Sequence, residues 1–102
     1  MPRFSVYRNP GAEGYLLDVQ ANILDHLNTR VVVPLLPVSI APKPAATLNP
    51  VFNVAGQPVV MVTQFLAAVP VSLLKLPESS LESFRDEITA AMDLLFQGCR
   101  VQ

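Results

Sequence analysis

Residues 51–65, VFNVAGQPVVMVTQF, consist of two apolar segments separated by a turn sequence. Segments 51–54 and 59–65 are rich in the β-branched and aromatic residues that favour strands. Gly56-Gln57 lies between them, and a glycine in the first turn position favours a type II′ turn. The stretch therefore predicts a β-hairpin within a chain of short antiparallel strands.

Similar short strands are expected on both sides of this hairpin, because apolar segments alternate there with glycine, proline and asparagine. They cover residues 4–7, 15–20, 31–36 and 69–74, with exposed loops at 9–14 and 41–44. Segment 31–36 is almost wholly apolar, as in a strand that is buried on both faces or at a subunit interface. Pro34 within it lacks an N–H and indicates an edge or bulge position. Segment 21–30 is polar, with one helical turn expected around 22–27.

The hydrophobic period changes near the C-terminus, where apolar residues recur at helical spacing. They are Leu81, Phe84, Ile88, Ala91, Met92 and Leu95. Ser79 and Glu82 have the spacing of a capping box, and Gly98 suits the left-handed residue that ends a helix. These patterns predict one mainly β (α+β) domain, a small antiparallel barrel with one C-terminal helix.

The composition and charge of the chain exclude several classes of protein. Of the 102 residues, 51% are hydrophobic and 15% charged, which excludes intrinsic disorder and favours self-association as a homodimer. Residues 44–74 carry no charge, but prolines, glycine and amides interrupt them too often for a membrane helix. The net charge of −1 and scattered basic residues argue against direct nucleic-acid binding. The absence of an apolar leader and the single cysteine favour a reducing, cytoplasmic location.

Candidate catalytic groups are few. The sequence has no phosphate-binding glycine loop and no motif for a metal or other cofactor. Asp25, His26 and Arg30 could cleave RNA by general acid-base chemistry. Alternatively, Asp25 shapes a turn and Arg30 lies on the surface, which we favour. Asp18 is interpreted as a solvent-facing strand carboxylate or a group bonded to a loop amide, with a buried functional acid as the alternative.

The end of the chain is unusually apolar, with Phe96, Cys99 and Val101 at or beyond the end of the predicted helix. Such residues either pack on the same molecule or its twin, or bind another protein. Cys99 is interpreted as a small apolar residue, with a reactive thiol as the alternative.

Several segments match one known family in order and spacing across essentially the whole chain. They are Phe4 with Val6-Tyr7, Asp18-Val19-Gln20, Ile23-Leu24-Asp25, Val33-Pro34-Leu35, Asn49-Pro50-Val51, Met61-Val62-Thr63, Val69-Pro70-Val71-Ser72 and Asp93-Leu94-Leu95-Phe96-Gln97-Gly98. Together they resemble the CcdB family of plasmid and chromosomal toxins. The resemblance implies a single toxin domain over residues 1–102, an SH3-like barrel of the CcdB/MazF type, and a homodimer.

The resemblance also implies a function without catalysis. CcdB-like toxins bind the A subunit of DNA gyrase, trap its DNA-cleavage complex and are neutralised by a CcdA-like antitoxin that folds on contact. The implied gyrase-binding residues are Ile23, Leu24, Asp93, Phe96, Gln97, Gly98 and Cys99. The implied antitoxin-binding residues are Arg8, Asn9, Ile40, Ala41 and Ala45.

One departure from the family pattern concerns its last residues, which are typically Trp-Gly-Ile. This chain has Gln97-Gly98-Cys99 and then Arg100, Val101 and Gln102. Losing the indole removes a typical hot-spot anchor, about 2 kcal/mol or more. Arg100 adds like charge where the family picture has a gyrase cation. Two alternatives stay open: a gyrase-inactive relative that binds only antitoxin, and a MazF-like endoribonuclease, because toxins of the MazF type share the implied barrel and cut RNA.

Overall fold

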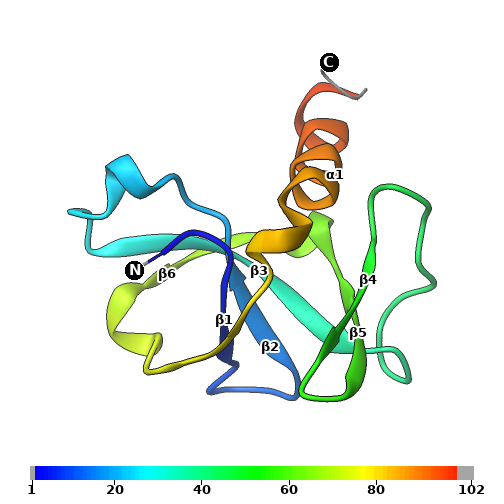
Figure 1. Cartoon of the computed structure of the whole chain (residues 1–102), viewed down its shortest axis with the longest axis horizontal. Coiled ribbons are helices and arrows are strands. Elements are labelled where there is room, and N and C mark those ends of the chain that lie inside the picture. Colours follow the sequence, from blue (N-terminus) through cyan, green and yellow to red (C-terminus); the bar gives the residue numbers. More distant parts are fainter. Residues whose placement is uncertain (1, 99–102) are drawn as a thin grey trace.

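A computed structural model describes residues 2–98 of the chain, which form an antiparallel sheet with a helix at one end (Figure 1). The strands are β1 (Ser5–Arg8), β2 (Tyr15–Asp18), β3 (Thr29–Pro37), β4 (Val51–Val54), β5 (Gln57–Met61), β6 (Ala67–Pro70) and β7 (Pro77–Ser80). Short 3₁₀ turns are η1 (Asn22–Leu24), η2 (Thr63–Phe65), η3 (Val71–Leu73) and η4 (Glu82–Phe84), and the helix is α1 (Arg85–Gln97).

The sheet has the order β4-β5-β3-β2-β1-β7, and β6 pairs with β3 beside β5. Every pairing is antiparallel. Within residues 2–98 the two ends of this order, β4 and β7, are not paired with each other, so the barrel is a half-barrel. The predicted fold class, a mainly antiparallel β barrel with a C-terminal helix, is confirmed.

The long strand β3 organises this sheet. One edge pairs with β2, while the other pairs first with β6 through residues 29–32 and then with β5 through residues 35–37. Pro34 lies where β6 gives way to β5, and its carbonyl accepts a hydrogen bond from the Val62 N–H (3.0 Å). The N–H and C=O of one strand residue point to the same neighbouring strand. The nitrogen of Pro34, which has no hydrogen to donate, therefore faces the break between β6 and β5, where no N–H donor is needed. Pro34 therefore lies not on an edge strand or at a bulge, the expected positions, but at a break between the two partner strands on one side of β3.

Both faces of the central strands are buried. One face of β1, β2 and β3 contributes Val6, Leu17 and Val33 to the main core, which also contains Ile88 of α1. The opposite face contributes Tyr7, Leu16 and Val32 to a second cluster, covered by Leu74. Double burial accounts for the uninterrupted apolar sequence of these strands and confirms one of the two interpretations of segment 31–36.

The predicted helix is present but begins later than the sequence suggests. Ser79 belongs to β7 and does not cap the helix, which starts at Arg85. The neighbouring Ser80 Oγ accepts a hydrogen bond from the Glu82 N–H (3.2 Å). The sequence Pro77–Ser80 has little strand propensity, so β7, which forms by pairing with β1, was not predicted. At the other end, Gly98 has φ of 74° and ends the helix as predicted.

Other strand limits also shift. The first strand begins at Ser5 because Phe4 has a positive φ of 70°, which extended strand residues do not adopt. The predicted strands 15–20, 59–65 and 69–74 end at Asp18, Met61 and Pro70, and 3₁₀ turns follow the last two. The helical turn expected around 22–27 is the shorter η1.

The hairpin turn differs in type from the prediction. Val54 pairs with Gln57, so the two loop residues are Ala55 and Gly56, and both have positive φ, 53° and 79°. This is a type I′ turn, not the predicted type II′ turn at Gly56-Gln57. An alanine in the left-handed region costs about 1 kcal/mol.

We predict that Ala55→Asn raises the free energy of unfolding by about 1 kcal/mol, because asparagine followed by glycine is the preferred type I′ sequence. Urea unfolding at one fixed protein concentration measures it. Ala68→Asn, on exposed strand β6, is the control and is expected not to stabilise the chain. Equal effects of the two substitutions would contradict the turn assignment.

No helix among residues 2–98 is both long enough and apolar enough to cross a membrane.

Candidate protein-binding site

Two exposed segments project from the same side of the molecule. Figure 1 shows segment 21–28, which contains η1, at the upper left and the end of α1 at the top. Ile23 is 85% exposed in the first segment, and Phe96 is 64% exposed in the last turn of the helix. Both apolar side chains are therefore accessible to a second protein.

A groove of about 440 Å³ lies between the N-terminal segment, η1 and α1. Its lining is mainly polar: Arg3, Phe4, Asn22, Glu82, Arg85, Asp86, Thr89, Ala90 and Asp93. Asn22 precedes Ile23, and Asp93 lies one turn before Phe96 and Gln97, so the two exposed segments border the same groove. The structure therefore brings both parts of the predicted gyrase-binding residues to one surface, with Leu24 and Gln97 also exposed and Asp93 half-buried. Gly98 is exposed, and Cys99 lies outside the described residues.

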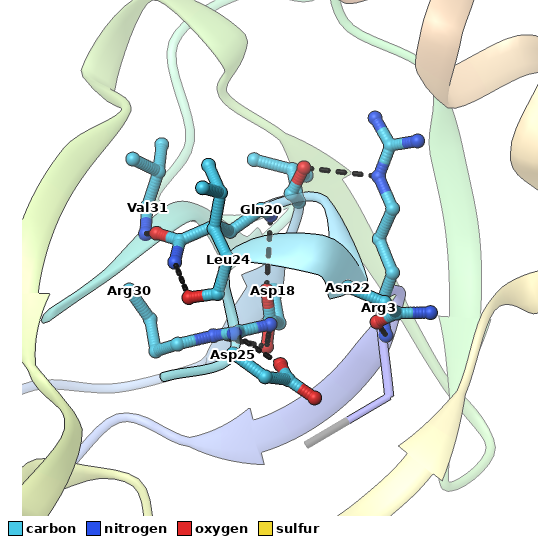
Figure 2. A network of polar contacts seen from close by, with 9 residues as sticks. Arg3, Asp18, Gln20, Asn22, Leu24, Asp25, Arg30 and Val31 are labelled. Carbon is cyan, nitrogen blue, oxygen red and sulfur yellow. Dashed lines mark hydrogen bonds and ion pairs between the residues drawn. The ribbon is translucent and has the colours of Figure 1, made fainter. Parts of the chain in front are cut away.

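Segment 21–28 is attached to the sheet by a buried arginine. Arg30 Nε and Nη2 donate to Asp18 Oδ2 at 3.0 and 2.7 Å, and Arg30 Nη1 donates to Asp25 Oδ1. Arg30 and Asp18 are fully buried, whereas the Asp25 side chain is 43% exposed. Figure 2 shows the guanidinium between the two carboxylates. The arginine thus joins strand β2 to the exposed segment.

Gln20 makes a second attachment. Its amide nitrogen donates to the Leu24 carbonyl (3.1 Å), and its amide oxygen accepts from the Val31 N–H (2.9 Å) (Figure 2). The backbone N–H of Gln20 donates to Asp18 Oδ1 (3.0 Å). Both oxygens of Asp18 are therefore bonded.

The electrostatics follow from this burial. Desolvation raises the pKa of Asp18 above its ordinary value, against the opposing effect of its hydrogen bonds from Arg30 and Gln20. Desolvation lowers the pKa of Arg30, but the hydrogen bonds and charges of Asp18 and Asp25 outweigh it and leave the pKa raised. Arg30 therefore stays charged between two carboxylates.

These contacts correct two expectations. Arg30 is not a surface residue, and Asp18 is buried and does not face solvent. Asp18 does accept a hydrogen bond from the backbone amide of Gln20, as the second half of that interpretation expected. The sequence signal was available, because an arginine in an apolar strand is a poor choice unless a carboxylate meets it. The same contacts weaken the RNA-cleaving hypothesis: Arg30 is fully buried and paired with Asp18 and Asp25, and so is not presented to a phosphate, while His26 is exposed.

The residues expected to bind antitoxin lie elsewhere, in the β1–β2 loop and the β3–β4 connection at the bottom and right of Figure 1. Gly14 allows the β1–β2 loop to approach strand β3. Its φ is +94°, and a Cβ at this position would lie 2.2 Å from the Leu35 carbonyl oxygen, so only glycine fits there. Arg8 is exposed, forms an ion pair with Glu78 (3.0 Å) and lies over the Tyr15 ring. Ile40 and Ala45 are exposed, while Asn9 and Ala41 are half-buried.

We predict that Asp18→Ala lowers the free energy of unfolding by about 3–5 kcal/mol, because it leaves Arg30 without its buried partner. The double substitution Asp18→Leu with Arg30→Met is expected to cost less than this single one. Glu78→Gln, which removes an exposed ion pair, is the control and should change stability by less than about 1 kcal/mol. Urea unfolding measures all three, and a double variant less stable than Asp18→Ala would contradict the prediction.

Among residues 2–98 no cluster of histidine, cysteine and acidic side chains could hold a metal ion.

The comparison with protein families agrees with this architecture. The model of the CcdB family, described as CcdB protein, matches residues 3–98, nearly the whole chain. Members of the family act as toxins and are not enzymes. The chain belongs to the CcdB family of toxins.

Proposed function

We propose that this protein poisons DNA gyrase by binding the A subunit of that enzyme and trapping the gyrase–DNA cleavage complex. The observation that supports the proposal is the exposure of Ile23 and Phe96 on the two segments that contribute Asn22 and Asp93 to one groove. Exposed apolar side chains beside polar groups are how protein interfaces obtain affinity and register. The proposed gyrase-binding residues are Ile23, Leu24, Asp93, Phe96, Gln97, Gly98 and Cys99.

A second surface, at the other end of the molecule, is proposed to bind a CcdA-like antitoxin. Arg8, Asn9, Ile40, Ala41 and Ala45 would contact it. Exposed Ile40 offers an apolar anchor and Arg8 a cation, which suits a flexible segment that folds on contact. The toxin would act inside the cell, where both partners are found.

The protein is also proposed to form a homodimer. The uncharged segment 44–74 leaves apolar side chains in contact with water, among them Val51 at 50% and Phe65 at 52% exposure. A monomer with so few charges would expose more apolar surface than is usual.

We predict that the purified protein converts supercoiled plasmid to linear DNA in the presence of gyrase and ATP, after detergent and protease treatment. Phe96→Ala is expected to reduce this cleavage at least about tenfold, because it removes the largest exposed apolar group of the surface. Leu76→Ala is the control: Leu76 is 82% exposed, but the η3–β7 connection lies far from the helix end (Figure 1).

The outcomes separate the functions left open. No linear DNA from a folded protein in large excess over gyrase would overturn the proposal. Tight antitoxin binding without cleavage would then indicate a gyrase-inactive relative. Equal activity of Phe96→Ala and Leu76→Ala would place the gyrase contact elsewhere.

We predict that light scattering at micromolar concentration gives twice the 11.1 kDa mass of the chain. Phe65→Asp is expected to lower this mass, because a charge would enter the apolar surface. A monomeric mass for the wild-type protein would contradict the proposed dimer.

A further inference from the structure

Segment 21–28 is ordered without contributing to the core. All of its side chains are exposed, and η1 contains no buried residue. Its internal backbone bonds are few: the Leu24 N–H donates to Ala21 O (3.0 Å), the Asp25 N–H to Asn22 O (3.1 Å) and the Leu27 N–H to Leu24 O (3.1 Å). A short turn without apolar burial does not offset the conformational entropy of ordering it. The segment therefore depends on contacts made to it from the sheet.

The two ends of this segment are held by backbone groups: the Arg3 N–H donates to Asn22 Oδ1 (2.8 Å), and the Val71 N–H donates to the Asn28 carbonyl (2.9 Å). Its middle is held by two residues of the buried network. Arg30 donates to the Asp25 carboxylate, and Gln20 donates to the Leu24 carbonyl. We call Gln20, Asp25 and Arg30 the loop clasp. It holds the chain directly after Ile23, the most exposed apolar side chain of the surface.

We infer that the loop clasp is a positioning device for gyrase binding, which fixes Ile23 and Leu24 in the conformation that gyrase meets. The inference rests on the proposed function. Arg30 is fully buried and cannot touch a partner protein, so its effect on binding is indirect and passes through its bond to Asp25. A binding segment that is ordered before contact avoids the entropy cost of ordering it on binding.

Asp25 is the position at which the clasp can be opened without breaking the core. When its carboxylate is removed, Asp18 still neutralises Arg30 through two hydrogen bonds. Asp25→Ala removes the acceptor, whereas Asp25→Asn keeps an oxygen that can accept from Arg30. Glu78→Gln is the matched control, because it removes a carboxylate paired with an arginine outside this segment.

The experiment measures two quantities on the same variants: backbone ¹⁵N order parameters of residues 22–27 and affinity for the isolated A subunit of gyrase. Asp25→Ala is expected to lower the order parameters from about 0.85 to below about 0.6. It is also expected to weaken binding about tenfold. Asp25→Asn should lie between Asp25→Ala and wild type in both, and Glu78→Gln should match wild type.

Three results would overturn the inference. Weaker binding with unchanged order parameters would make Asp25 a direct contact. Loosening of the segment with unchanged affinity would show that gyrase binding does not need the clasp. No change in either would show that other contacts hold the segment. All three require a wild-type chain that binds the isolated gyrase protein; absence of that binding would instead overturn the proposed function.

Discussion

The buried pair of Asp18 and Arg30 is the constraint around which the exposed surface of this protein is arranged. The charges of Asp18 and Arg30 are both removed from water. This desolvation opposes the ionisation of Asp18 and raises its pKa. The pair is retained with both oxygens of Asp18 bonded and with no unpartnered buried side-chain nitrogen or oxygen among the described residues. Such a pair contributes little net stability. Its consequence is geometric, because the same guanidinium that pairs with Asp18 also binds Asp25 and so holds the exposed segment to the sheet.

The sheet makes this pair possible. Strand β3 serves as the common partner of β2, β5 and β6, and its two faces are covered by different clusters. Arg30 and Val32 lie on the face opposite Val33, beside Asp18 of the neighbouring strand, which pairs with Val32. A strand exposed on one face would leave this arginine in water, where it could not fix a loop. Because both faces of β3 are covered, Arg30 is buried with Asp18 and can hold segment 21–28 to the sheet through Asp25.

Sequence reasoning named the residues of the proposed binding surface but not the contacts that hold them in place. Ile23 and Phe96 came from the family resemblance, and the structure exposes both on the two segments whose Asn22 and Asp93 line one groove. Asp18 and Arg30 were expected on the surface because polar residues in a short β protein usually face solvent. Gln20 attracted no expectation, since a single amide gives no sign of which backbone groups it will meet. Pairings between residues 18, 25 and 30 depend on how a loop returns to its strand, which spacing alone does not specify.

The sequence by itself determined the elements with strong local signals: the hairpin around residues 51–61, the helix ending at Gly98, and family membership. Hydrophobic periodicity and the positive φ that glycine allows depend on only a few neighbouring residues, so the sequence predicts them without knowledge of the fold. Only the tertiary structure decided that Pro77–Ser80 forms a strand, that Ala55 shares a type I′ turn, and that Arg30 is buried. In each case the local preference is weak or contrary, and a tertiary contact outweighs it. Pairing with β1 makes a strand of Pro77–Ser80, and the twist of the hairpin holds Ala55 at a positive φ. The carboxylates of Asp18 and Asp25 allow Arg30 to be buried.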